Sequence, residues 1–170
     1  MPITEVVTLA VTAPYTHQSV PLRQLQTLAS RQSAYSAYPV LFFADTNFPS
    51  RIYMLSGWHD VEASYVWLDS PDWVEMLALL EPFGAIQSRI FIGIDFDAIP
   101  RHGVLLLRRQ TRVTRLRSSP ASAFWQASGE ELDAQTNGTY TIEIYSHDDL
   151  DHLPMDNSVS MRQLSLSRLG

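Results

Sequence analysis

The fold is decided by the stretch RIYMLSGWHDVEASYVWLDSPDW, residues 51–73. Its first part, 51–58, is an apolar run that predicts a β-strand. Asp60 follows directly and is an N-cap residue for a short helix that extends to Leu68. Ser70 and Pro71 are an N-cap and a first-turn proline, which together open a second helix. The stretch therefore predicts a strand followed by two helix starts.

Working outward from this stretch, the pattern on both sides completes a known arrangement. A β-branched run predicts a strand over 5–13, and Ser19 caps a helix that continues at helical spacing to about Tyr35. A strand over 40–44 forms a hairpin with 51–58, and the second helix ends at Pro82. Residues 89–97 alternate as a fourth strand. The order β-α-β-β-α-β is the ferredoxin-like split βαβ, an α+β fold with both helices on one face of an antiparallel sheet.

The remaining residues repeat this plan incompletely. We expect a strand over 104–113, a helix over 118–132, a strand over 139–145 and a last edge strand over 158–167. The sequence thus predicts a complete ferredoxin-like repeat in residues 1–100 and an abbreviated second ferredoxin-like repeat in residues 101–170. The second repeat is expected to pack on the first.

Missing residue types exclude several classes of enzyme. The 170 residues contain no Cys, and all 12 basic residues are Arg. Thiolate nucleophiles, Cys-ligated metals, lysine Schiff bases and P-loops are therefore excluded. Gly-rich nucleotide motifs are also missing, so we expect no NAD, FAD or ATP. No apolar run is long enough for a membrane span and no secretory signal is visible, which makes the cytoplasm the expected location.

The net charge of −6 is unevenly distributed. Residues 1–100 carry ten acidic residues and four Arg, whereas residues 101–170 carry eight of each. Nucleic acids and anionic membranes require many cationic contacts, so neither is an expected partner. Six Arg cluster over 101–117. They either pair with the acid-rich stretch 130–156 on a solvated surface, which is the favoured interpretation, or clamp an anionic ligand.

Three segments of the first half resemble the antibiotic-biosynthesis-monooxygenase-like group of the dimeric α/β-barrel superfamily, and Asp95 to Pro100 followed by a new strand resembles tandem members found in fungi. The segments are Ile52 to Ala63, Leu68 to Asp72 and Leu79 to Phe83. They match a strand ending in Trp, an acidic-Ala segment and a Ser-Pro helix start. The resemblance implies two sheets that close face to face into a barrel, with a pocket between each sheet and its own helices. The second sheet comes either from a partner chain, as a homodimer, or from residues 103–170.

The resemblance also implies a range of activities, because the superfamily includes cofactor-independent oxygenases, polyketide cyclases, dehydratases, haem-handling enzymes and members without known activity. Many members carry His six or nine residues after the strand-end Trp. Here those positions are Ser64 and Trp67. His59 and Tyr65 are the remaining candidates for catalytic proton transfer.

Aromatic residues concentrate in the first half and predict a cavity for a flat apolar ligand. The expected substrate-binding residues are Tyr35, Tyr38, Phe42, Tyr53, Trp58, Trp67 and Trp73. His17 is a weaker candidate for the rim of a pocket. His147 and His152 lie among acidic residues, but the spacing fits a solvated loop better than a metal site, so no metal is expected.

The sequence therefore predicts a small cofactor-independent enzyme, monooxygenase-like, that acts on an aromatic or polyketide-type intermediate of secondary metabolism. Deprotonation of a phenol or an activated carbon would precede reaction with dioxygen. Three alternatives stay open: a cyclase or dehydratase of the same fold, a non-catalytic ligand-binding or scaffold protein, and a haem handler, since His can ligate iron.

Overall fold

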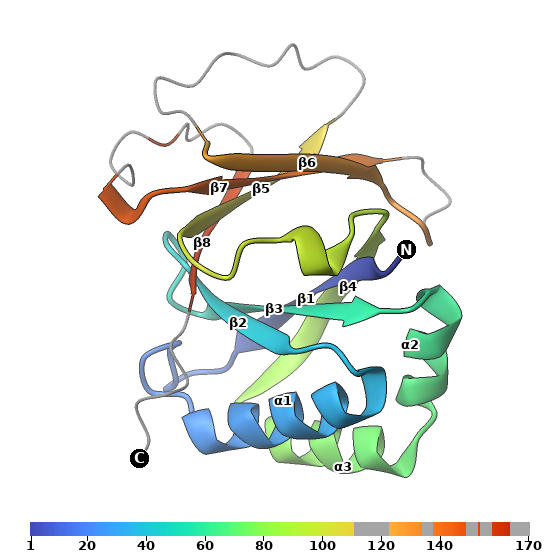
Figure 1. The fold of residues 1–170 in the computed structure, drawn as a ribbon. Coiled ribbons are helices and arrows are strands. Elements are labelled where there is room, and N and C mark those ends of the chain that lie inside the picture. The colour runs from blue at the N-terminus through green and yellow to red at the C-terminus, as the bar shows by residue number, and fades with distance from the viewer. Residues whose placement is uncertain (111–122, 134–137, 149–152, 154–157, 164–170) are drawn as a thin grey trace.

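The computed structural model describes residues 1–110, 123–133, 138–148, 153 and 158–163 (Figure 1). The first half contains four strands, three α-helices and a short 3-10 turn: β1 (Ile3–Val11), α1 (Leu22–Ser36), β2 (Val40–Asp45), β3 (Arg51–Trp58), α2 (Val61–Leu68), α3 (Pro71–Leu80), β4 (Gly84–Ile92) and η1 (Phe96–Ala98). The second half contains β5 (Val104–Gln110), β6 (Trp125–Glu130), β7 (Thr139–Tyr145) and β8 (Ser158–Gln163).

All eight strands belong to one antiparallel sheet with the order β4-β1-β3-β2-β8-β5-β7-β6. The first four strands in this list have the ferredoxin-like order, and the last four repeat it with β8, β5, β7 and β6 in the equivalent places. The predicted α+β fold with an abbreviated second repeat is therefore confirmed. In the described residues after 104 the second half has strands but no α-helix.

The sheet closes into a barrel within one chain. On one side β2 pairs with β8 over Phe43 to Asp45. On the other side a single bridge joins Ile92 to Glu131, flanked by a hydrogen bond of 2.9 Å from the Gly93 N–H to the Glu130 carbonyl. We call this second junction the β4–β6 seam. It supplies the internal closure that the sequence left open.

Three hydrophobic clusters fill the layers. The first lies between the first half-sheet and α1, α2 and α3, and includes Trp58, Trp67 and Trp73. The second lies between the two half-sheets, and the third covers the outer face of the second half-sheet. Figure 1 shows the helices on one side of the first half-sheet and the second half-sheet on the other.

Local signals placed most elements of the first half correctly. The Asp60 carboxylate accepts from the Ala63 N–H at 2.8 Å, and Ser70 caps α3 through the Trp73 N–H. The Ser19 cap was wrong. Pro21 precedes α1 without a side-chain cap, and the Ser19 hydroxyl instead accepts from the Thr16 N–H within a turn.

Three other predictions need correction. The fourth strand runs over Gly84–Ile92 rather than 89–97, because Asp95 accepts from the Asp97 N–H and starts η1. The helix over 118–132 is wrong from residue 125 on, where β6 pairs with β7; residues 118–122 lie outside the described part. The last strand is not at an edge, since β8 lies between β2 and β5. Residues 111–113 and 164–167 of the predicted strands also lie outside the described part.

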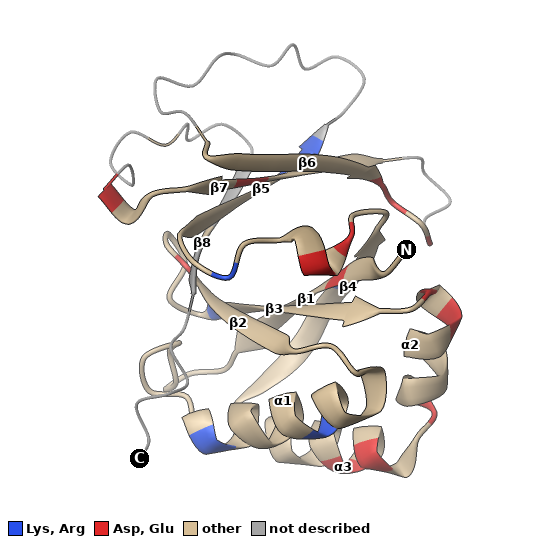
Figure 2. Ribbon diagram, viewed as in Figure 1, with Lys and Arg blue, Asp and Glu red and all other residues tan. Residues whose placement is uncertain are grey.

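Charged residues are distributed unevenly between the two halves, as the sequence indicated. Figure 2 shows acidic residues on α2, α3 and η1. Two of the clustered arginines pair as expected: Arg109 with Glu131 at 3.2 Å and Arg108 with Glu143 at 3.0 Å. The Arg108 pair is largely buried rather than solvated. No helix among the described residues is long and apolar enough to cross a membrane.

Candidate functional site

The centre of the candidate site is a buried carboxylate on β1. Glu5 lies on the same face of the strand as Ile3 and Val7, which pack under the helices, and it is 1% exposed. Its Oε2 accepts from Trp58 Nε1 at 2.6 Å and from the Ser56 hydroxyl at 3.0 Å. A buried charge requires such partners to offset its desolvation, so this arrangement fixes the strand-end Trp through its indole N–H.

Arg89 of β4 provides the opposite charge. Its Nε donates to Glu5 Oε1 at 2.7 Å, and its Nη2 donates both to the same oxygen and to the Ser64 hydroxyl, the latter at 2.7 Å. The guanidinium lies over the Phe91 ring with its carbon 5.3 Å from the centroid. Among the described residues none accepts a hydrogen bond from its remaining nitrogen, Nη1. With the Arg89 side chain 18% exposed, this nitrogen can donate to solvent or to an oxygen atom of a ligand.

Tyr65 of α2 forms the outer edge of this group. Its ring packs against Phe91 at 5.9 Å, and its hydroxyl donates to the Asp133 carboxylate, which follows β6 in the second half. The hydrogen bond to Asp133 raises the pKa of Tyr65, and desolvation adds to the effect. The hydroxyl consequently stays protonated at neutral pH. It can donate a hydrogen bond or a proton, but it is a poor base.

The sequence did not single out Glu5, Arg89 or Asp133. The sequence could have indicated Glu5, because it is a charged residue that alternates with the apolar Ile3 and Val7 on the same face of a strand. In the same way, Arg89 lies on the same face of β4 as the apolar Phe91. Asp133 had none, since only the three-dimensional closure of the β4–β6 seam brings it to Tyr65. Ser64 was noted as a replacement for His, and the structure shows it bound to Arg89.

The nine residues predicted for the site lie in three different places. Five share the layer between the first half-sheet and the helices: Tyr35, Phe42, Trp58, Trp67 and Trp73. The Tyr35 ring contacts Trp67 at 5.1 Å and Trp58 at 6.4 Å, and Trp67 contacts Trp73 at 6.3 Å. Two residues, Tyr38 and Tyr53, face the cluster between the half-sheets instead. Tyr65 and His59 lie at the surface.

The two residues between the half-sheets have structural partners. Tyr53 is 3% exposed and donates to Asp45 Oδ2 at 2.8 Å. Burial, followed by the bond to Asp45, raises its pKa. Tyr38 packs edge to face on Phe96 at 6.1 Å. Tyr53 does not share a layer with Trp58, because the two are five positions apart on β3 and face opposite sides of the sheet. Tyr38 lies in the bend before β2 and belongs to the cluster between the half-sheets.

His59 does not point into the protein. Its side chain is 86% exposed, and its Nδ1 lies 2.9 Å from Asp60 Oδ2. The neighbouring His and the Ala63 N–H hold the pKa of Asp60 below its usual range. His17 lies in the loop before α1 with its Nδ1 3.2 Å from the Pro49 carbonyl oxygen. His147 is exposed, and His152 lies outside the described residues.

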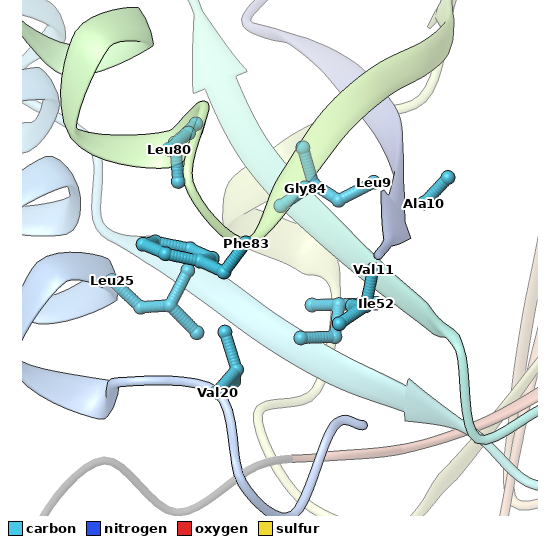
Figure 3. Close-up of a pocket in the computed structure, with 9 residues that line it drawn as sticks. All are labelled: Leu9, Ala10, Val11, Val20, Leu25, Ile52, Leu80, Phe83 and Gly84. Atoms are coloured by element: carbon cyan, nitrogen blue, oxygen red, sulfur yellow. The ribbon is translucent and has the colours of Figure 1, made fainter. Parts of the chain in front are cut away.

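A small cavity lies in the same layer, at the end away from the strand-end Trp. It is lined by Leu9, Ala10, Val11, Val20, Leu25, Ile52, Leu80, Phe83 and Gly84 (Figure 3). Its volume of about 10 Å³ is at the lower limit for a single water molecule, and its wall is apolar. It cannot hold an aromatic substrate without rearrangement. In the part of the chain that the structure describes, no group of three or more His, Asp or Glu is arranged to hold a metal ion.

These features define the class of fold: a ferredoxin-like α+β barrel of two half-sheets, of the type found in dimeric α/β-barrel proteins. No protein-family model matches the sequence, and no curated protein matches it. Several solved structures share the fold over nearly the whole chain.

Two of these structures are provisionally named as monooxygenases. The protein from Fusobacterium nucleatum has a TM-score of 0.58 and 11% identity, covering 96% of this chain and 93% of that one. The protein from Lactobacillus acidophilus has a TM-score of 0.57 and 12% identity, covering 95% and 93%. A third, provisionally named as a chlorite dismutase, has a TM-score of 0.57 and 8% identity, covering 97% and 95%. At such identities the likeness shows the fold.

Proposed function

We propose that this chain is a cofactor-independent, monooxygenase-like enzyme that acts on an aromatic or polyketide-type intermediate of secondary metabolism. The observation that supports it most is the Glu5–Arg89 pair in the layer between sheet and helices, whose guanidinium lies over Phe91, the ring that also packs against Tyr65. A fixed guanidinium in a layer lined by Trp58, Trp67 and Tyr35 suits a flat ring system that carries a phenolate or enolate oxygen.

Each polar residue has a distinct role in this proposal. Arg89 Nη1 binds the oxygen on which negative charge develops when the substrate loses a proton. Glu5 is a positioning residue, since it holds the guanidinium through two nitrogens and does not itself reach outward. Tyr65 is the proton-handling residue: its hydroxyl stays protonated at neutral pH and donates to the departing oxygen.

The chemistry balances without an added reductant. An anthrone-like substrate with an activated CH2 group loses a proton to solvent water. The resulting carbanion is oxidised by O2 to a carbon-bound peroxide, which takes a proton from solvent to become the hydroperoxide. Loss of the second C–H proton then forms the C=O bond while the O–O bond breaks, and the departing hydroxide takes a proton to leave as water. The substrate supplies all four electrons, so one O2 yields one ketone and one water.

Oxygen uptake with 1,8-dihydroxyanthrone tests this proposal. We expect one O2 consumed per anthraquinone formed. We also expect Tyr65→Phe to lower turnover by about 100-fold, with an unchanged circular dichroism spectrum. Gln87→Leu, an exposed change on β4, is the matched control and should keep full turnover. Product formed without O2 uptake would exclude the oxygenase.

A second candidate is a non-catalytic ligand-binding or scaffold protein. Two observations favour it: Ser64 and Trp67 stand where the resemblance implies His, and Trp58 and Trp67 are each only 1% exposed. This candidate predicts that His59→Ala and Tyr65→Phe leave every measurable activity of the producing pathway intact. A loss of activity in Tyr65→Phe alone would exclude it.

A further inference from the structure

Two buried side chains in the sheet–helix layer, Gln32 and Trp67, have polar atoms that find no hydrogen-bond partner among the described residues. Gln32 lies on the buried face of α1 and is 1% exposed, yet neither its amide oxygen nor its amide nitrogen has a partner. Trp67 of α2 is also 1% exposed, and its Nε1 has none. Buried polar groups without partners are rare because each loses its hydration with nothing in exchange. A leucine at position 32 would have continued the apolar face formed by Leu25 and Leu28.

Tyr35 connects these two residues. It lies one helical turn after Gln32, so the two side chains share a face of α1. Its ring contacts Trp67 at 5.1 Å and also reaches Trp58. Tyr35 is 46% exposed and is the outermost ring of this group. Tyr35, which borders solvent, thus shares a helix face with the unpartnered amide and contacts the ring that carries the unpartnered indole N–H.

We propose that Gln32 and Trp67 recognise the polar end of an aromatic ligand, which enters when Tyr35 rotates away from Trp67. The ligand class follows from the donors and acceptors. Trp67 Nε1 donates to a carbonyl or phenol oxygen, while the Gln32 amide both donates to and accepts from a hydroxyl beside a carbonyl. A hydroxylated polycyclic ketone meets both requirements, and its rings stack on the aromatic side chains. The inference rests on the proposed function for the substrate class.

Binding of 1,8-dihydroxyanthraquinone, which does not turn over, tests the site directly through quenching of Trp fluorescence. We expect Gln32→Met to weaken binding by about tenfold, the effect of losing a buried hydrogen bond. The same variant should melt at the same temperature as the parent or higher, because it replaces an unpartnered amide by an apolar chain of similar length. Gln87→Leu should leave both quantities unchanged.

Trp67→Phe provides the second variant, since it removes the N–H and keeps an aromatic ring. It too should weaken binding by about tenfold. Unchanged binding in both variants would overturn the inference, and so would a lower melting temperature of Gln32→Met with unchanged binding, which would show that buried water satisfies the amide. Failure of the parent protein to bind the probe would overturn it as well.

The two proposals fail in different ways. Normal binding that weakens in the variants, without O2 uptake from 1,8-dihydroxyanthrone, would support the binding site and exclude the oxygenase. Normal O2 uptake together with normal binding by Gln32→Met would keep the proposed function and exclude this site.

Discussion

The two half-sheets have the same strand order, and each buries an arginine–glutamate pair, but the surroundings of the two pairs differ. In the first half, Arg89 and Glu5 lie beneath helices, next to Trp58, Ser64 and Tyr65. In the second half, Arg108 and Glu143 lie on the outer face of the sheet, where Tyr145 also donates to Glu143 at 3.0 Å. Both half-sheets therefore bury an ion pair. Among the described residues, helices cover only the pair of the first half, and this cover makes it a candidate site.

Replacing each arginine should give the largest difference in stability between the two ion pairs. We expect Arg89→Met to cost about 3–5 kcal/mol of unfolding free energy, because it leaves the Glu5 carboxylate buried without its counter-ion. Arg108→Met should cost less, since the Glu143 side chain is 10% exposed against 2% for Glu5 and its charge is more easily hydrated. Urea denaturation measures both values.

Turnover adds a second contrast between these variants. Arg108→Met should keep the activity of the parent, whereas a double variant Glu5→Leu with Arg89→Met should regain much of the stability but no activity. Equal stability losses in the two single variants would show that helix cover does not distinguish the halves.

The β4–β6 seam, where the two halves join, allows a second comparison, between Gly129 and Gly93. A Cβ at Gly129 of β6 would lie 2.7 Å from the carbonyl carbon and oxygen of Gly93, whereas a Cβ at Gly93 would meet its nearest atom at 3.5 Å. We therefore expect Gly129→Ala to cost about 1–3 kcal/mol, as overpacking does, and to open the β4–β6 seam. Gly93→Ala should be close to neutral.

Thermal unfolding measures these costs, and amide exchange at Leu132, which donates to the Phe91 carbonyl at 2.9 Å, reports on the seam. Fast exchange at Leu132 in Gly129→Ala with normal exchange in Gly93→Ala is the expected result. If both variants behave alike, close backbone contact does not hold the seam together.

Local signals explain how much of this fold was predictable. Caps such as Asp60 and Ser70 act over three residues, so the sequence placed α2 and α3 correctly. The strand β6 was predicted as a helix because Ser118, Ser119 and Pro120 are typical of a helix start, whereas its burial alternates and it pairs with β7. The position of β8 within the sheet likewise depends on β2, far away in sequence. Local patterns cannot report such distant partners.

The site was predictable only in part, for the same reason. Aromatic richness located the sheet–helix layer through Trp58, Trp67 and Trp73, but it could not assign Tyr38 and Tyr53 to the opposite face. The polar group around Glu5 depends on three strands and a helix that meet in space. The Tyr65–Asp133 bond depends on closure of the barrel.

Alkaline pH should affect stability through the buried tyrosines of both halves. Burial raises the pKa of Tyr53 in the first half and of Tyr145 in the second, and bonds to Asp45 and Glu143 add to the effect. These groups stay protonated in the folded chain but ionise near pH 10 when it unfolds. The stability they contribute is therefore complete below about pH 10 and declines as the pH rises further.

Urea unfolding at about pH 8 and about pH 11 measures this decline. Tyr53→Phe should reduce the difference between the two conditions, and it should do so more than Tyr145→Phe, because the shift at Tyr53 is the larger. A difference that neither variant changes would assign the alkaline sensitivity to other groups.

His59 carries the smallest expected effect, and its test decides between two proton carriers. Its side chain is 86% exposed beside Asp60, so His59→Ala should leave the melting temperature of the protein within error. If Tyr65 handles the proton, turnover of 1,8-dihydroxyanthrone should also be unchanged near pH 7. If His59 does, turnover should fall in His59→Ala and recover with added imidazole, while Tyr65→Phe stays active. His102 of the second half, which stacks on Phe124 at 5.4 Å, provides the matched His→Ala control.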